Sequence, residues 1–437
     1  STGTVVEVGR IEIENQFLKF TNDVRPQVER VVFAKDGSTV DLTGGLTFTA
    51  DADQSGDRLD GTSQADVLQG SANDETLRGF AGDDTLIGDA GNDALSGGEG
   101  NDTLISGAGD DRLSGGEGDD TFKFAVGESG FGVDTIGEFD TLELGEDTIE
   151  FAADIDPDQI RFVRNLGSDS LEIVVETTSS TGTVVEVGRI EIENQFLKFT
   201  NDVRPQVERV VFAKDGSTVD LTGVLTLTAD TSGEGLVGTS QADVLQGSAN
   251  DDTLRGSAGD DTLIGGAGND VLSGDEGNDT FKFAAGESGF GFDKIGTLSA
   301  LEPGEDTIEF AADIDPGQVR FVRDRDSFFD RLGSDELDII VETTSSTGTV
   351  VEVGRIEIEN QFSTLTNEVR PQVERVVFAK DGSTVDLTGG LTFTADADQS
   401  GDRLDGTSQA DVLQGSANDD TLNGFGGDDT LIGGAGR

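Results

Sequence analysis

Carboxylate side chains recur at every ninth residue in three blocks of this 437-residue chain, at 61–123, 238–282 and 406–432. Each lies at the sixth position of a nonamer of the form G-G-x-G-x-D-x-U-x, where U is a large apolar residue, as in 97–105 (GGEGNDTLI). The glycine-rich loop exposes backbone carbonyls, so each nonamer offers an anionic, oxygen-only ligand set. Such a set suits Ca²⁺ and not the metals that prefer thiolate or imidazole. The predicted ligands are Asp66, Glu75, Asp84, Asp93, Asp102, Asp111, Asp120, Asp243, Asp252, Asp261, Asp270, Asp279, Asp411, Asp420 and Asp429.

Two departures from the nonamer pattern indicate weaker sites. Glu75 is the one glutamate in the acidic series, and its longer side chain is expected to weaken or reshape that site. In the first full nonamer of each block, Gln64, Gln241 and Gln409 replace the second loop glycine. We expect these edge turns to cap the block rather than to bind calcium well.

The last three residues of each nonamer predict a short strand whose large apolar residue points inward. Glycines allow the preceding six residues to wrap as a tight loop, and we expect the apolar residue of the next nonamer to stack on the one before. This pattern predicts a calcium-loaded parallel β-roll, a solenoid built of nonapeptides. The inward series is Leu68, Leu77, Leu86, Leu95, Leu104, Leu113 and Phe122, then Leu245, Leu254, Leu263, Leu272 and Phe281, then Leu413, Leu422 and Leu431.

Two simpler interpretations compete with the metal-loaded roll. A flexible Gly/Asp-rich linker gives no reason for leucine at every ninth position. A solenoid without metal is disfavoured, because carboxylates stacked at a strand spacing of less than ~5 Å repel unless a cation lies between them.

Composition excludes several classes of function. The chain has 88 acidic and 29 basic residues, a net charge of −59, so nucleic acid is not a natural partner. Without calcium the acidic blocks are expected to be expanded, and calcium binding would then drive folding. The chain has no His, Cys, Tyr or Trp, which removes the usual general bases, thiol nucleophiles and sugar-stacking rings, so we expect no enzyme. No segment is apolar enough for membrane insertion.

A longer repeat overlies the nonamers. Residues 1–50 recur at 180–229 and, with more changes, at 346–395. The repeating unit is one nonamer block plus one small β-sheet module, which predicts an all-β tandem array. The expected domains are a partial β module at 1–50, a β-roll at 51–123, a β module at 124–228, a β-roll at 229–282, a β module at 283–394 and a truncated β-roll at 395–437. Because methionine is absent and the last nonamer is incomplete, we expect a piece of a longer polypeptide.

The complete first module alternates apolar and polar residues in short runs. Strands are expected near 147–151, 160–163, 171–176, 184–196, 207–212 and 218–221, with at most a short helical turn near Asp156-Pro157.

The nonamers and the module together resemble the RTX (repeats-in-toxin) proteins secreted by Gram-negative bacteria. The module segments GEDTIEF (145–151), DIDPDQIRFVR (154–164), GRIEIENQF (188–196) and VERVVFAKDGSTVDL (207–221) are similar to the haemolysin-type calcium-binding-related domain. The resemblance implies that the sixth-position carboxylates and loop carbonyls bind calcium between turns. It also implies type I secretion, with folding outside the cell or at the cell surface.

The sequence leaves two hypotheses open for the role of the chain. Near-identical copies favour a calcium-stiffened segment of a long extracellular fibre, such as an adhesin stalk, a biofilm-matrix filament or a surface-layer component, with neighbouring copies as partners. The alternative is the calcium-dependent secretion and folding tail of a large toxin, bacteriocin or polysaccharide-modifying enzyme. Carbohydrate adhesion by the modules is disfavoured because stacking Trp and Tyr rings are absent.

Overall fold

The computed structural model describes most of the chain from residue 44 onward. The described residues are 44–50, 56–127, 130–137, 145–196, 206–229, 233, 235–286, 289–296, 304–323, 336–344, 350–359, 361, 372–395 and 403–436, with the backbone alone of 30–32, 39–41, 198–199 and 202–203. Most of the predicted partial module at 1–50 therefore lies outside them. Within 1–50 the antiparallel pair β1 (Arg30–Val32) and β2 (Thr39–Asp41) is described, together with residues 44–50, which include β3 (Thr47–Thr49).

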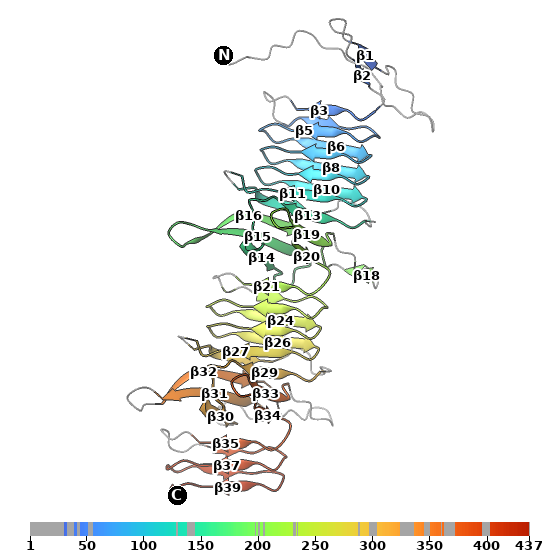
Figure 1. The fold of residues 1–437 in the computed structure, drawn as a ribbon. Helices are drawn as coiled ribbons and strands as arrows, with labels where there is room; N and C mark the ends of the chain where they lie inside the picture. The colour runs from blue at the N-terminus through green and yellow to red at the C-terminus, as the bar shows by residue number, and fades with distance from the viewer. Residues whose placement is uncertain are drawn as a thin grey trace. The chain divides into compact units, whose positions relative to one another are not determined.

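The chain forms two compact units, residues 1–160 with 172–222 and residues 161–171 with 223–437. Both are built of β-strands, as Figure 1 shows. In the described part of each unit the helical structure is one 3-10 turn, η1 (Pro157–Gln159) or η2 (Pro316–Gln318). The first lies where the sequence predicted a short helical turn. The predicted all-β fold with parallel β-rolls is confirmed.

In unit 1 the nonamers alternate between two parallel strand ladders. Leu68 pairs in register with Leu86, and Leu77 with Leu95, so ladder neighbours are eighteen residues apart. One ladder contains β3 (Thr47–Thr49), β5 (Val67–Gln69), β7 (Thr85–Ile87), β9 (Thr103–Ile105) and β11 (Thr121–Phe124). The other contains β4 (Arg58–Asp60), β6 (Thr76–Ala81), β8 (Ala94–Glu99), β10 (Arg112–Glu117) and β12 (Gly132–Ile136).

This arrangement corrects the expectation that each nonamer stacks on the next. A complete turn of the roll must cross to the facing sheet and return, so it takes two nonamers. The expectation of three-residue strands is also wrong for one ladder, where β6, β8 and β10 each span six residues. These three strands continue into the loop of the next nonamer, where Phe80 of β6 pairs in register with Gly98 of β8.

The inward apolar residues form the core of each roll. In the first two blocks every residue of the predicted inward series is at most 1% exposed. In the third block Leu413 is buried, Leu422 is half-buried and Leu431 is exposed.

The β module of unit 1 extends both ladders of its roll. Strand β11 pairs in parallel with β13 (Thr148–Phe151), and β13 with β19 (Arg209–Phe212), which turns back antiparallel onto β20 (Thr218–Asp220). On the other side β12 pairs in parallel with β16 (Val184–Ile192), next to β15 (Leu171–Thr178). A small antiparallel pair, β17 (Lys198–Phe199) and β18 (Asp202–Val203), lies outside these ladders.

Phenylalanine rings fill the junction between roll and module. Phe124 lies 5.3 Å from Phe131 and 6.2 Å from Phe151, between ring centroids, and Phe151 lies 5.6 Å from Phe212. Unit 2 repeats the cluster with Phe283, Phe290, Phe310 and Phe378. The module is therefore joined to its roll by a shared core as well as by shared sheets.

In unit 2 one ladder continues from a roll through a module into the next roll. Its ten strands are, in order, β22 (Gly235–Val237), β24 (Thr253–Ala258), β26 (Val271–Glu276), β28 (Gly291–Ile295), β32 (Val350–Ile358), β31 (Leu337–Thr344), β30 (Val319–Val322), β35 (Thr392–Thr394), β37 (Val412–Gln414) and β39 (Thr430–Ile432). The three module strands β32, β31 and β30 are antiparallel neighbours, and Phe321 of β30 then pairs in parallel with Phe393 of β35.

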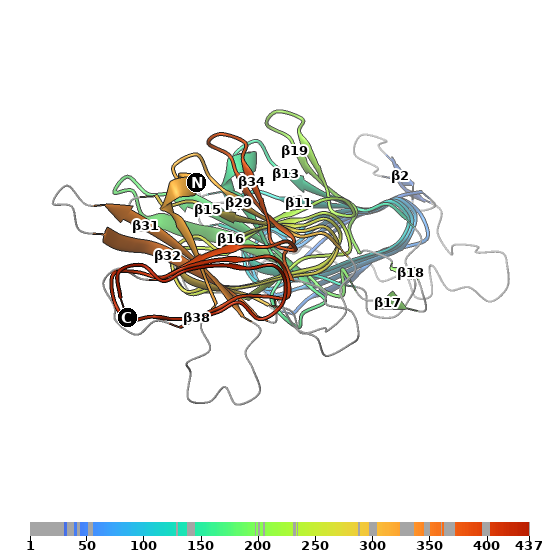
Figure 2. The same cartoon turned by 90° about the horizontal axis from the view of Figure 1, so that it is seen from below.

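The remaining strands of unit 2 complete the facing side. They are β21 (Thr226–Thr228), β23 (Val244–Gln246), β25 (Thr262–Ile264), β27 (Thr280–Phe283), β29 (Thr307–Phe310), β33 (Arg375–Phe378) and β34 (Thr384–Asp386), with the pair β36 (Arg403–Asp405) and β38 (Thr421–Asn423) in the third roll. Strand β14 (Ile160–Val163) pairs with β21 through Phe162 and Leu227. Figure 2 shows the same strands after a turn of 90°, seen from below.

The buried column predicts the cost of a core truncation. Leu263→Ala should destabilise the second roll by about 2–5 kcal/mol, because it leaves a cavity between stacked leucines. Hydrogen exchange of peptides covering 253–264 in saturating calcium, across a urea series, measures the loss. Val271→Ala is the control, since that side chain is 45% exposed, and should cost under about 1 kcal/mol. Equal effects of the two changes would contradict the assignment of Leu263 to the core.

Candidate calcium centres

The sixth-position carboxylates form two inner columns, one at each side of the roll. In each column one carboxylate oxygen accepts the backbone N–H of the residue eighteen positions earlier. Asp84 Oδ1 accepts from Asp66 N at 2.6 Å and Asp102 Oδ1 from Asp84 N at 2.7 Å, whereas Asp111 Oδ1 accepts from Asp93 N at 2.7 Å in the other column. The same bonds link Asp243, Asp261 and Asp279, Asp252 with Asp270, and Asp411 with Asp429. The predicted ligands are thus brought together in columns, and one oxygen of each linked acceptor is used by the backbone.

The second carboxylate oxygen is buried in the interior turns and accepts no hydrogen bond. Except in the nonamer of Asp111, where Ser106 is at position one, it faces the glycine at position one of the same nonamer. A Cβ at Gly97 would lie 2.6 Å from the carbonyl oxygen of Gly115 and closer still to Asp102 Oδ2, so glycine leaves a cradle of carboxylate and carbonyl oxygens. The carboxylates with this free Oδ2 are Asp84, Asp93, Asp102, Asp111, Asp261, Asp270 and Asp279.

These features fit a calcium ion. A buried ionised oxygen needs a partner of opposite charge, and the cradle oxygens are the hard ligands that Ca²⁺ prefers. Within the described residues no three acidic side chains gather as a metal cluster. Each centre would therefore use a carboxylate of one nonamer together with backbone carbonyls, as in the pair Asp102 and Gly115. When bound, calcium would neutralise the column and tie successive turns together.

In the first two nonamers of each block a threonine or serine side chain donates a hydrogen bond to the carboxylate. Thr62 donates to Asp66 Oδ2 from its backbone N–H at 2.6 Å and from its hydroxyl at 2.8 Å. The other position-two hydroxyls that bond the sixth-position carboxylate of their own nonamer are those of Ser71, Thr239, Ser248, Thr407 and Ser416. Ser257, at position two of an interior nonamer, instead donates to the carbonyl oxygen of Gly238 at 3.4 Å. These bonds give the edge turns an internal substitute for a cation. The first nonamer of each block thus has a threonine at position two that bonds the carboxylate, in addition to its position-four glutamine.

Glu75 is accommodated by the same device. Ser71 donates its backbone N–H to Glu75 Oε2 at 2.8 Å and its hydroxyl to Oε1 at 2.7 Å. Both oxygens of the longer side chain therefore have partners within the protein.

A second, outer ladder explains the Asp or Asn at position five. Asp83 Oδ1 accepts the N–H of Asn101 at 2.9 Å, and Asn101 Oδ1 accepts that of Asp119 at 3.0 Å. In the second block Asp251 Oδ1 accepts from Asn269 at 2.8 Å. The acidic pairs in the sequence thus divide their roles, because position five links turns at the surface and position six lines the interior.

Four further aspartates extend the inner columns beyond the nonamers. Asp134 Oδ1 accepts from Asp111 N at 2.9 Å and Asp147 Oδ1 from Asp120 N at 2.8 Å, and the second block repeats these bonds with Asp293 and Asp306. The sequence analysis missed them because the spacing is 23 or 27 residues instead of 18. The half-nonamer G-x-D-x-U, present at 132–136, 145–149, 291–295 and 304–308, could have revealed them.

Glutamates close one column at the end of the module. Glu208 Oε2 accepts the N–H of Asp147, and Glu374 Oε2 accepts that of Asp306, each at 2.5 Å. Burial raises the pKa of both glutamates.

Burial also raises the pKa of the interior aspartates. The pKa of Asp84, Asp93 and Asp261 rises to about 7. Four others, Asp102, Asp111, Asp270 and Asp279, reach a pKa of about 6. Neighbouring acids add to the shift, so the ionised columns disfavour folding when no cation is bound.

An arginine of each module reaches the first nonamer of the following roll. Arg164 Nη1 donates to the carbonyl oxygen of Gly238, and Arg323 Nη1 donates to that of Gly406. Both glycines are at position one, whose carbonyl lines the cradles of interior turns. A fixed positive charge therefore stands at the start of these two rolls.

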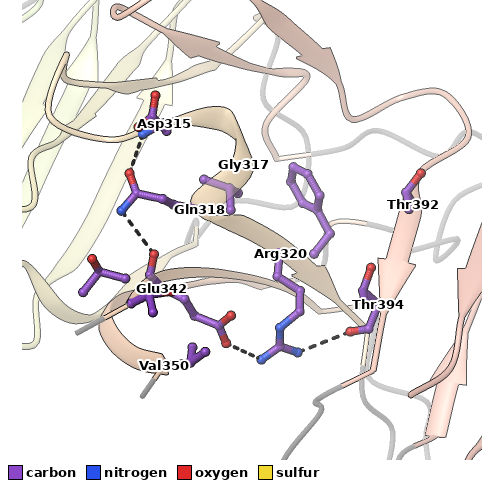
Figure 3. A pocket seen from close by; sticks show the side chains of 12 residues that line it. Asp315, Gly317, Gln318, Arg320, Glu342, Val350, Thr392 and Thr394 are labelled. Atoms are coloured by element: carbon purple, nitrogen blue, oxygen red, sulfur yellow. Dashed lines mark hydrogen bonds and ion pairs between the residues drawn. The ribbon is translucent and has the colours of Figure 1, made fainter. Parts of the chain in front are cut away.

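A polar pocket lies where the last module meets the third roll (Figure 3). Arg320 donates to Glu342 Oε1 at 2.9 Å and to the carbonyl oxygen of Thr394 at 3.3 Å, and Gln318 Nε2 donates to the carbonyl oxygen of Glu342 at 3.2 Å. Asp315 N donates to Gln318 Oε1 at 2.7 Å. Three of these bonds join groups of the module to one another, and the bond from Arg320 to the Thr394 carbonyl reaches β35.

Comparison with known proteins identifies the nonamers. The RTX calcium-binding nonapeptide repeat (4 copies) matches residues 51–86, 60–95, 87–122, 236–263, 246–281 and 405–437. Among curated proteins no relative matches. Among solved structures, the extracellular lipase LipA from Serratia marcescens matches with a TM-score of 0.15 and 14% identity over 71% of this chain. The match covers 39% of the lipase, and similarity this low says nothing about activity.

Filling one cradle should remove one calcium centre. Gly97→Ala places a methyl group against Asp102 Oδ2 and the Gly115 carbonyl oxygen, so we expect at least one bound calcium fewer by native mass spectrometry. Gly317→Ala is the control, because a Cβ there meets nothing within 4 Å. An unchanged calcium count in Gly97→Ala would refute the cradle as a ligand site.

Acidification should partly replace calcium. The folded-state pKa values of about 6 to 7 exceed the ordinary 3.8, so the metal-free folded state binds more protons than the unfolded chain. Its stability is therefore greater at low pH and falls as the pH rises through that range. Metal-free protein should show more β-structure by far-UV circular dichroism at about pH 5 than at about pH 9. Spectra that do not differ would contradict the burial of these carboxyl groups.

Proposed function

Because its three nonamer blocks are RTX calcium-binding repeats, we propose that the chain is a structural segment of a long secreted bacterial fibre that folds and stiffens in extracellular calcium. An adhesin stalk, a biofilm-matrix filament and a surface-layer component are the settings that fit. The observation that carries the proposal is the ten-strand ladder of unit 2, which runs from one roll through a module into the next roll.

The module acts as a connector in this proposal. A roll ends in sheet edges that need covering or pairing. Strand β32 pairs with the last roll strand, β28, and β30 pairs with β35 of the next roll. Arg323 and Arg320 add hydrogen bonds to the same junction. Repeating such a unit adds length rather than a new active site.

Calcium is the folding switch. In low calcium the buried columns repel, and the chain with its net charge of −59 stays expanded for secretion. Outside the cell calcium would be held by the interior aspartates and the position-one carbonyls, and the rolls would form. Half-saturation at about 0.1–1 mM is the range of extracellular calcium modules.

The role is proposed to be non-enzymatic. The composition without His or Cys supports this, as does the Arg320 pocket, whose polar groups bind one another. In the described part of the chain no helix is long and apolar enough to cross a membrane. We also propose that neighbouring fibres associate through calcium, because divalent ions can bridge acidic surfaces and the chain has a net charge of −59.

Length measurements test the fibre. Chains with one and two additional copies of residues 180–345 should lengthen in calcium by a constant step. Each copy adds seven strand steps from β22 to β35, or about 35 Å at ~4.8 Å per step. Small-angle X-ray scattering in 5 mM calcium gives the maximum dimension.

The same chains in chelator are the control, and should be expanded without a fixed increment. A compact protein instead grows only as about the 0.38 power of its length. Growth of that kind in calcium would reject the fibre, while leaving calcium-dependent folding intact.

A further inference from the structure

We propose that Asp134 and Asp293 each hold a calcium ion at the junction between a roll and its β module, outside the nonapeptide repeats. The inference rests on the proposed calcium-dependent fold and adds two centres that the nonamer pattern does not contain. They would make docking of the module depend on calcium as well.

The two carboxylates have the features of the interior nonamer aspartates. Both are 0% exposed, and the Oδ2 of each is buried without a hydrogen-bond partner. Their Oδ1 atoms accept the N–H of Asp111 and Asp270 at 2.9 and 2.8 Å. The inner column of Asp111, like that of Asp270, therefore continues to an aspartate of the module, Asp134 or Asp293, whose Oδ2 has no hydrogen-bond partner.

The backbone around them keeps the loop geometry of a nonamer. Gly132 and Gly291 both have φ of 89°, and a Cβ at either would collide with the carbonyl of Gly109 or Gly268. Within the first roll Gly100, at position four, approaches the carbonyl of Gly82 in the same way. The G-x-D half of the loop is thus retained, although the residues before it differ.

The charged groups that act on the two carboxylates are acids. They are Asp111 and Asp110 for Asp134, and Asp270 and Asp251 for Asp293. A cation is therefore needed if these side chains are to be ionised inside the fold.

The basic residues on the flanking strands lie on the outer face. In the first junction Arg112 pairs in register with Thr135 and Arg189 with Val133, one residue to either side of Asp134. Arg189 bonds Glu186 and Glu172. In the second junction Lys294 bonds Glu357, and Arg355 bonds Glu352. Arg189, Lys294 and Arg355 therefore have carboxylate partners outside the column.

The two junctions differ at one position. Ser106 lies beside Asp134 and its hydroxyl is buried, whereas the second block has Gly265 at the same place. Burial raises the pKa of Asp134, and against this larger effect the hydroxyl is a polar neighbour that lowers the pKa. The site at Asp293 does without it, so the common ligand is the aspartate.

Counting bound ions tests the proposal. Native mass spectrometry of the full chain in calcium should show one ion fewer for Asp134→Asn, one fewer for Asp293→Asn and two fewer for the double variant. Asp158→Asn removes the same charge from an exposed site of the module and should lose none. Asp102→Asn, in an interior nonamer, should lose at least one.

The outcomes separate the two proposals. Loss of calcium in Asp102→Asn with an unchanged count in Asp134→Asn and Asp293→Asn overturns the junction sites alone. A wild-type chain that binds no calcium overturns the proposed function itself.

A measurement on the wild type covers the case of variants that do not fold. Crystals grown with a lanthanide should give anomalous peaks beside Asp134 and Asp293 as well as beside Asp102. Peaks confined to the nonamers would reject the junction sites.

Discussion

A buried carboxylate oxygen without a protein partner is the constraint on which this fold depends. In the interior nonamers one oxygen of the sixth-position aspartate accepts a backbone N–H. The other faces position one, which is a glycine except at Ser106, as Asp102 Oδ2 faces Gly97 beside the Gly115 carbonyl. Stacking such groups is unfavourable unless a cation neutralises them. Glycine at position one, the close stacking of turns and the fit to a calcium ion are consequences of this one arrangement.

The protein itself supplies partners for the first carboxylates of the columns and for the last N–H of one column. Thr62 and Ser71 bond the first carboxylates of the first roll, and Glu208 accepts the last N–H of one column. Arg164 and Arg323 place a positive charge at the start of the following rolls. Asp102 and, at a column end, Asp134 thus keep a buried oxygen without a partner in the protein, whereas the first nonamers have internal partners.

The modules solve a different problem, that of open sheet edges. Because β28, β32, β31, β30 and β35 form one ladder, the edge of the second roll is paired with strands of the module and then with the third roll. Phe283, Phe290 and Phe310 fill the junction beneath that ladder. The result joins repeats through both hydrogen bonds and a shared core.

The parallel β-roll, its calcium chemistry and most of the module strands could be predicted from the residues alone, because each nonamer carries its own loop, ligand and core residue. Pairing at eighteen residues and the hydroxyl caps required the folded chain, whereas the aspartates at 134 and 293 are marked in the sequence only by the half-nonamer G-x-D-x-U. Which strands are ladder neighbours depends on how many nonamers make one turn. Asp134 and Asp293 lie 23 residues, not 18, after their partners Asp111 and Asp270, yet they accept the same backbone hydrogen bond.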